Sequence, residues 1–179
     1  GEKKEKKGHT AKENIIGENL VEIKGLTTNI LNNIDIHIKK GEIVGISGLA
    51  GSGQQELLQA IYGAKNHIGT AGKNGVQINS TIAYVSGDRT KEGVFPLWDI
   101  RNNILIANLD RVKGKILLNR KECDDSANYW YDKLKFRAEG IESNIMSLSG
   151  GNQQKALIAR GIASEADIII LNDPTAGVD

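Results

Sequence analysis

The sequence lacks several features that mark particular classes of protein. Cys123 is the one cysteine among 179 residues, so no internal disulfide is possible, which suits a reducing compartment. No charged-then-apolar leader opens the chain, and aliphatic runs such as 168–171 fall far short of the ~20 residues that span a bilayer. A net charge of +1 gives no bulk field toward nucleic acid or an anionic membrane. We therefore expect a cytosolic protein with no direct membrane insertion and no nucleic-acid partner.

The composition is that of an ordinary globular domain. Apolar residues make up 39% of the chain and charged residues 25%, and the length suffices for one core. Residues 1–18 differ, because their first fourteen, "GEKKEKKGHTAKEN", mix lysine with glutamate and hold no aliphatic side chain larger than alanine. Such a stretch cannot bury enough surface to order itself, and its glutamates argue against a basic patch for phosphate or lipid. We expect residues 1–18 to form a charged linker or tail, and residues 19–179 to form one domain.

Apolar alternation predicts the strands. In "NIDIHIK" the isoleucines 34, 36 and 38 face one way and polar residues the other, which is typical of a half-buried antiparallel layer, together with "NLVEIKGL" before it. "EIVGIS", residues 42–47, is apolar on both faces and predicts a buried central strand. "TIAYVS" and "DIIIL", residues 81–86 and 167–171, predict two more strands. The glycine- and asparagine-rich stretch 63–79 predicts loop or short strands.

Helical signals occupy the rest of the chain. Leu57, Leu58 and Ile61 predict an amphipathic helix over about 53–62. The region of about 97–147 is expected to be mostly helical, with Asp99 as a helix N-cap and Asn119 followed by Glu122 at capping-box spacing. A further helix is expected from the string "LSGGNQQK", which starts at residue 148, to about residue 164.

A glycine-rich loop joins the strand predicted at 42–47 to the helix that follows. Its glycines could let backbone N–H groups converge on phosphate oxygens at the N-terminus of a helix, as in a P-loop. Gln54 stands where the P-loop lysine belongs, and Gln55 stands where the Mg²⁺-binding hydroxyl belongs. A glycine-rich turn without a ligand is an equally good interpretation of this loop alone, whereas Glu56 in place of a third glycine argues against dinucleotide binding. The candidate nucleotide-binding residues are Gly48, Leu49, Ala50, Gly51, Ser52, Gly53, Gln54 and Gln55.

Taken together and in this order, the glycine loop, the helical insert, "LSGGNQQK" and "IIILNDPTAGVD" resemble an ATP-binding cassette (ABC) nucleotide-binding domain. The resemblance runs from about residue 19 to 179. It implies an α/β P-loop fold with an antiparallel β layer and a helical subdomain at about 97–147. It also implies that the domain as a whole is incomplete at its C-terminus. "SGDR", "EGVFPLWDIRNNI", "GSGQQEL" and "LSGGNQQK" resemble the ATPase subunits of bacterial sugar importers of the ribose, galactose and xylose type and their nucleoside-importer relatives. Those subunits carry two fused cassettes, and the missing loop lysine and the charged start of this chain resemble the second one.

The resemblance assigns roles residue by residue, and some residues depart from the pattern. In the Walker B motif Asn172 replaces the aspartate that holds Mg²⁺, and Asp173 replaces the catalytic glutamate. Gly87 stands where the family carries glutamine or, in this subfamily, glutamate, and no aromatic lies near residues 27–30 to stack on adenine. The D-loop begins at Asp179. The signature that acts in trans comprises Leu148, Ser149, Gly150, Gly151, Asn152 and Gln153.

The intact signature and the altered P-loop would then serve different ATP sites. In this family each ATP lies between the P-loop of one cassette and the signature of the other. A serine hydroxyl, glycine N–H groups and the helix dipole suit a partner's γ-phosphate. We expect ATP to bind weakly or in trans, Mg²⁺ to be possible but with degraded ligands and no assigned metal-site residue, and this copy to be inactive alone. The alternatives are an ATPase that tolerates the substitutions and a regulatory cassette outside transport.

The expected partners are a second cassette, fused or separate, and membrane permease subunits, with the protein at the inner face of the cell membrane. Phe95 and Trp98 lie where cassettes of the family often contact the permease, although packing between subdomains explains them equally well. Tyr129, Trp130 and Tyr131 are interpreted as helix packing.

Overall fold

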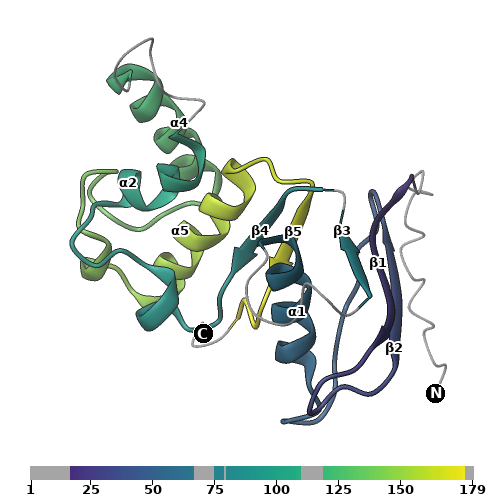
Figure 1. Ribbon diagram of the computed structural model, residues 1–179. Helices are drawn as coiled ribbons and strands as arrows, with labels where there is room; N and C mark the ends of the chain where they lie inside the picture. The colour runs from purple at the N-terminus through teal and green to yellow at the C-terminus, as the bar shows by residue number, and fades with distance from the viewer. Residues whose placement is uncertain (1–16, 67–74, 79, 110–118, 176–179) are drawn as a thin grey trace, which may run out of the picture.

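The computed structural model describes residues 17–66, 75–78, 80–109 and 119–175. Figure 1 shows a sheet-containing part, with the β-strands and α1, beside a helical part that holds α2, α4 and α5. Nearly all of the expected linker, the end of the glycine-rich stretch at residue 79, and Asp179 lie outside the described residues.

An antiparallel layer forms one side of the molecule, as predicted. Its strands are β1 (Asn19–Leu26), β2 (Ile34–Lys39) and β3 (Val76–Ile78), in the order β2-β1-β3. Val21 and Ile23 pair with Ile38 and Ile36 and are fully buried, whereas the polar residues of β2 are exposed. Alternation with period two therefore sets the register, because a slip of one residue would turn the isoleucines to solvent.

The second sheet pairs strands far apart in sequence. β4 (Ile82–Val85) runs parallel to β5 (Ile168–Leu171), and α1 (Gln54–Asn66) lies between them and the antiparallel layer (Figure 1). One hydrophobic cluster joins the three elements: its buried members include Leu57 and Ile61 of α1 and Ile170 of β5. The helix continues through Gly63 to Asn66, so the prediction of loop at 63–66 was wrong. A helical glycine costs only about 1 kcal/mol, which packing overrides.

The helical part carries its own core. It contains α2 (Ile100–Leu105) with a 3₁₀ turn at Ile106–Asn108, α4 (Arg120–Lys133), a 3₁₀ turn at Ile145–Ser147, α5 (Gly150–Ala163) and a π-turn at Arg89–Gly93. Both predicted caps are present: an Asp99 carboxylate oxygen accepts from Asn102 N–H at 2.7 Å, and Asn119 accepts from Glu122 N–H. The fully buried side chains at its centre are Ile100, Asn103, Ile104, Ala127, Ile145, Ala156 and Ala159.

The strand predicted at residues 42–47 is absent. The segment forms no strand, and Ile43 and Val44 are 95% and 42% exposed. A run that is apolar on both faces stays buried only where neighbours cover both faces, and among the described residues it instead borders an apolar groove of about 420 Å³ along β5. Ile169 and Leu171 of β5 are also partly exposed. Within β5 only Ile170 is buried.

We expect this groove to make the chain self-associate, because an apolar strand edge invites pairing with another chain. Ile43→Lys or Ile169→Lys should shift the chain toward monomer in analytical ultracentrifugation across a concentration series. Leu97→Lys is the matched control, since Leu97 is 90% exposed in the helical part. A wild-type chain that is monomeric at high concentration, or a Leu97 variant that dissociates equally well, would contradict this role of the groove.

A second prediction concerns pH. Hydrogen bonds from Thr81, its backbone N–H first and its hydroxyl second, lower the pKa of Asp167 below 3.8. A carboxylate with a depressed folded-state pKa stabilises the fold above its unfolded pKa, and this contribution is lost as pH falls through the folded value. Asp167→Asn should therefore unfold at lower urea than wild type at pH 7, with a difference that shrinks below pH 3.8. A difference that grows on acidification would refute it.

Candidate functional site

The glycine loop, residues 48–53, is a turn that leads into α1; residues 48–52 are exposed and Gly53 is buried. Gly51 and Gly53 have φ angles of +84° and +94°, a left-handed conformation that favours glycine. A Cβ on Gly53 would lie 2.7 Å from Leu31, so this glycine also permits close packing against the antiparallel layer. The loop thus leads into a helix and has the backbone freedom that its glycines predicted, but the strand predicted before it is absent.

Gln54 folds back across this loop. Its Nε2 donates a hydrogen bond to the carbonyl oxygen of Leu49 at 3.1 Å, and a Cβ on Gly48 would lie 2.7 Å from the same nitrogen. Two residues on, Glu56 stands in the first turn of α1, where its carboxylate suits the helix dipole. The N-terminus of α1 therefore already has a negative side chain of its own.

A shallow pocket of about 530 Å³ opens beside the loop. The segment around Asn29 and Ile30 forms its other wall. The described residues that line it offer amides and one carboxylate but no cation: Asn29, Ile30, Gly51, Gly53, Gln54, Gln55, Glu56 and Gln59.

Three of the altered positions, 87, 172 and 173, meet where β4 and β5 end. A Cβ on Gly87 would lie 2.9 Å from the carbonyl oxygen of Asn172 and 3.3 Å from the Cβ of Asp173. Asn172 donates its side-chain N–H to the Tyr84 hydroxyl at 3.0 Å, and Asp173 is exposed with a φ of +44°. Close backbone approach thus explains the glycine at position 87.

Sequence reasoning missed Tyr84 as a member of this cluster. Burial raises the pKa of its phenol, against the hydrogen bond from Asn172. Within β4 it reads as one more apolar strand residue, so no local pattern distinguishes it. Its contact with Asn172 depends on the parallel pairing of two distant strands.

The signature begins α5 in the helical part. Ser149 occupies the N-cap position and is exposed, while Leu148 before it is buried. The Ser149 side chain makes no capping bond, and its Oγ instead accepts from Asn152 Nδ2 at 3.2 Å. Gln153 Nε2 reaches back to the Leu148 carbonyl, also at 3.2 Å. These two side chains fix the turn, and the Ser149 side chain caps none of the first N–H groups of α5.

The glycine loop and the signature lie in different parts of the molecule. Figure 1 shows α1 against the sheets and α5 inside the helical part. The structure therefore brings Gly87, Asn172 and Asp173 together, while the signature starts on a separate element.

The Phe95–Trp98 loop forms an exposed apolar patch with Met146. The Phe95 and Trp98 rings stack with centroids 4.5 Å apart, and exposure is 41% for Phe95, 90% for Leu97, 37% for Trp98 and 48% for Met146. The Trp98 carbonyl accepts from Ile145 N–H, which holds Met146 beside the loop. Of the aromatics on α4, Trp130 and Tyr131 pack against the core as predicted, and Tyr129 is exposed.

Two structural checks bear on metals and membranes. Within the described ranges, no three or more histidine, cysteine, aspartate or glutamate residues gather as a metal site. None of the helices in those ranges has the length and apolar character needed to cross a bilayer.

Comparison with known proteins decides the family. The ABC transporter family model matches residues 31–176. The chain belongs to the ABC transporter ATP-binding family. It is 34% identical to the L-arabinose transport ATP-binding protein AraG of Geobacillus stearothermophilus over 92% of this chain, and 38% identical to the fructose import ATP-binding protein FruK of Bifidobacterium longum over 89%. It spans 36% and 33% of those proteins, about a third of their length.

Solved structures show the same fold. A dimeric ATP-binding cassette in a post-hydrolysis state, bound to ADP and Pi, matches 89% of this chain with a TM-score of 0.71 and 23% identity, and 76% of that chain is covered. The cbiO1 component of a Clostridium perfringens ABC transporter matches 90% with a TM-score of 0.69 and 20% identity, over 68% of its length. The expected α/β cassette fold, with its antiparallel layer and helical part, is confirmed.

The contact at Gly87 yields a stability prediction. Gly87→Ala should destabilise the fold by about 1–3 kcal/mol, the usual cost of overpacking, because its Cβ would press on the Asn172 backbone. Gly45→Ala is the control: a Cβ there meets nothing within 4 Å, so its effect should stay within about 0.5 kcal/mol. Urea unfolding of both variants measures the difference, and equal stability of the two would show that the close approach is unimportant.

Proposed function

We propose that this cassette serves a sugar-type or nucleoside-type importer, and that its functional half is the signature rather than its own glycine loop. The contrast between two helix starts carries the proposal. At α5, Ser149 is exposed and makes no side-chain cap, whereas at α1 the Gln54 side chain closes over the loop. The start of α5 is open to an anion from outside, whereas the start of α1 has the Gln54 side chain across its loop and the Glu56 carboxylate in its first turn.

The start of α5 suits a partner's γ-phosphate. Helix N–H groups and the helix dipole favour an anion there, and the Ser149 hydroxyl can donate to it. Gln153 and Asn152 hold the turn through their own hydrogen bonds, so the site is preorganised before any ligand arrives. ATP bound on the partner's P-loop would complete this site in trans.

The chain's own loop does not fit a magnesium–triphosphate complex. A lysine at position 54 would attract phosphate by up to ~4 kcal/mol at 4 Å and an effective dielectric of 20, before desolvation. The Gln54 amide instead bonds to Leu49, and Glu56 would repel a phosphate near the helix start. The loss of the lysine alone corresponds to up to roughly three decades of affinity.

The end of β5 gives the same indication for Mg²⁺. Asn172 presents an amide whose nitrogen is engaged with Tyr84, so one charged ligand is missing. Asp173, exposed and one methylene shorter than glutamate, is a poor substitute for the catalytic base. We therefore assign no hydrolytic step to this cassette's own loop, and infer that turnover occurs at the partner's ATP.

The partners follow from the apolar patch and from the relatives. An apolar patch rimmed by polar residues marks an interaction surface, and the Phe95–Trp98 loop with Met146 fits a permease segment at the inner face of the membrane. Relatives of similar identity are named for import of arabinose, galactose, xylose and fructose, so this segment does not choose the sugar. A second cassette completes the assembly.

The test uses a transporter in which this cassette is paired with an intact one. Ser149→Arg should lower ATP turnover roughly 100-fold or more, because the side chain fills the space for the partner's γ-phosphate. Ser149→Ala is the matched control, since it removes the hydroxyl but keeps the space, and should cost less. Gln54→Lys should change turnover by no more than about twofold, because Asn172 and Asp173 remain.

Other outcomes identify the alternatives. Full turnover in Ser149→Arg together with a several-fold gain in Gln54→Lys would reverse the assignment of the two halves. Mg²⁺-dependent phosphate release by the chain alone, abolished by Gly53→Asp, would show a working ATPase. An intact pair that binds no permease would indicate a regulatory cassette.

A further inference from the structure

Arg160 connects α5 to the Phe95–Trp98 loop. It lies near the C-terminal end of α5, and its guanidinium makes three hydrogen bonds. Nε donates to the Asn103 carbonyl at 2.7 Å, Nη1 to the Gly93 carbonyl at 2.7 Å and Nη2 to the Asn103 side-chain oxygen at 3.1 Å. The same guanidinium lies 5.2 Å from the centre of the Phe95 ring. One side chain of α5 therefore binds the chain on both sides of the Phe95–Trp98 loop, at Gly93 before it and at Asn103 after it.

The bonding partners of Arg160 are uncharged. Burial lowers the pKa of its guanidinium to about 10, and the three acceptors are two carbonyls and an amide. A charge held without a carboxylate is costly, so the arrangement is a poor way to add stability. What it provides is geometry, because a planar fork fixes three acceptors at once.

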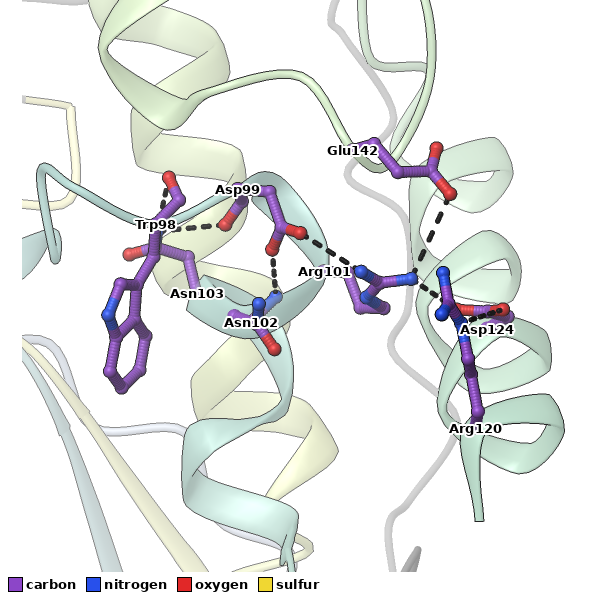
Figure 2. Close-up of polar contacts among 8 residues, drawn as sticks. All are labelled: Trp98, Asp99, Arg101, Asn102, Asn103, Arg120, Asp124 and Glu142. Carbon is purple, nitrogen blue, oxygen red and sulfur yellow. Dashed lines mark hydrogen bonds and ion pairs between the residues drawn. The ribbon is translucent and has the colours of Figure 1, made fainter. Parts of the chain in front are cut away.

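Asn103 holds the other side of the loop. It is fully buried, its Nδ2 donates to the carbonyls of Phe95, Trp98 and Asp99, and its Oδ1 accepts from Phe95 N–H at 2.9 Å. Figure 2 shows the Asn103 side chain bonded to Trp98 and to Asp99. Since Arg160 also binds Asn103, the loop, α2 and α5 share a single polar centre.

Arg101 offers a contrast within the same part of the molecule. Its guanidinium pairs with carboxylates of Asp99, Asp124 and Glu142, and so links α2 to α4 (Figure 2). These ion pairs raise the pKa of Arg101, with Asp124 the largest cause. Arg101 therefore stabilises the helical part, while Arg160 connects the loop to the signature helix.

We infer that Arg160 is a positioning residue that fastens the Phe95–Trp98 loop to α5, so that displacement of the loop reaches the Ser149 end of that helix. Arg160 lies ten residues after Gly150, the first residue of α5, so the helix between them is an arm of about 15 Å. A partner that covers Phe95 would exclude water from the guanidinium–ring contact and strengthen it. The identity of that partner rests on the proposed function; the fastening does not.

A double-mutant cycle in hydrogen exchange tests the fastening on the 179-residue chain. Trp98→Ala perturbs the loop, and the amides of 152–155 report on the start of α5. In the wild-type background we expect Trp98→Ala to raise the exchange rate of the amides of 152–155 by about threefold or more. When Arg160→Gln is also present, the same substitution should raise that rate by less than about 1.5-fold. Arg101→Gln is the matched control and should leave the response to Trp98→Ala intact.

Several results would overturn the inference. They are an unchanged response to Trp98→Ala in Arg160→Gln, an equal loss of response in Arg101→Gln, or no response in the wild type. If Arg160→Gln does not fold, Arg160→Lys decides: it keeps the charge but not the fork, so the response should fall at least by half, roughly, and a full response would refute the role of the fork.

The assembled transporter supplies a second readout. Arg160→Lys should leave basal ATP turnover near wild type but reduce its stimulation by the loaded permease several-fold, because the loop no longer moves α5. Equal stimulation in the variant and wild type would count against the inference. A wild type that the permease does not stimulate would instead refute the proposed function, and the exchange experiment would still stand.

Discussion

The helical part depends on one buried polar centre. Asn103 is fully buried, and each of its side-chain atoms has a partner in the loop, in α2 or in Arg160. An unpaired amide at this depth would cost about 1–3 kcal/mol, so the arrangement persists only while all partners are in place. That condition positions the exposed aromatic rings at the surface and aligns α5 behind them. Surface patch and signature helix are thus two ends of a single packing unit.

The two phosphate-type features differ in what already satisfies them. At α1 the Glu56 carboxylate lies in the first turn, and the Gln54 amide donates across the loop to the Leu49 carbonyl. At α5 the polar side chains next to the start, Asn152 and Gln153, bond to Ser149 and Leu148 and hold the turn without capping it. A helix N-terminus attracts an anion only if no local group has taken that place. This contrast supports the proposal that an anion from outside is bound at α5 rather than at α1.

Local pattern predicted much of this architecture. Alternation at 34–39 correctly predicted an antiparallel strand whose isoleucine face is half-buried. The side chains of Asp99 and Asn119 cap the two helices at the positions that the sequence predicted. The prediction of a strand at 42–47 was wrong. Burial of Ile43 depends on neighbouring elements, and an apolar run in the sequence does not specify those neighbours. The contacts of Gly87 and Tyr84 with Asn172 escaped prediction for a related reason, since they arise from the pairing of β4 with β5, more than eighty residues apart.

The division of roles also explains why these substitutions can coexist with an ordered fold. Gln54, Asn172 and Asp173 each replace a group that serves a ligand, and each is exposed or half-buried at the end of an element rather than inside a core. Gln54 and Asn172 have moreover found partners within the chain, in Leu49 and Tyr84. The signature cannot change in the same way, because its geometry is tied through α5 and Arg160 to the packing of the whole helical part. Under the proposed function, a site that acts on a partner's ligand would thereby be kept by the fold itself, whereas the chain's own site would be free to change.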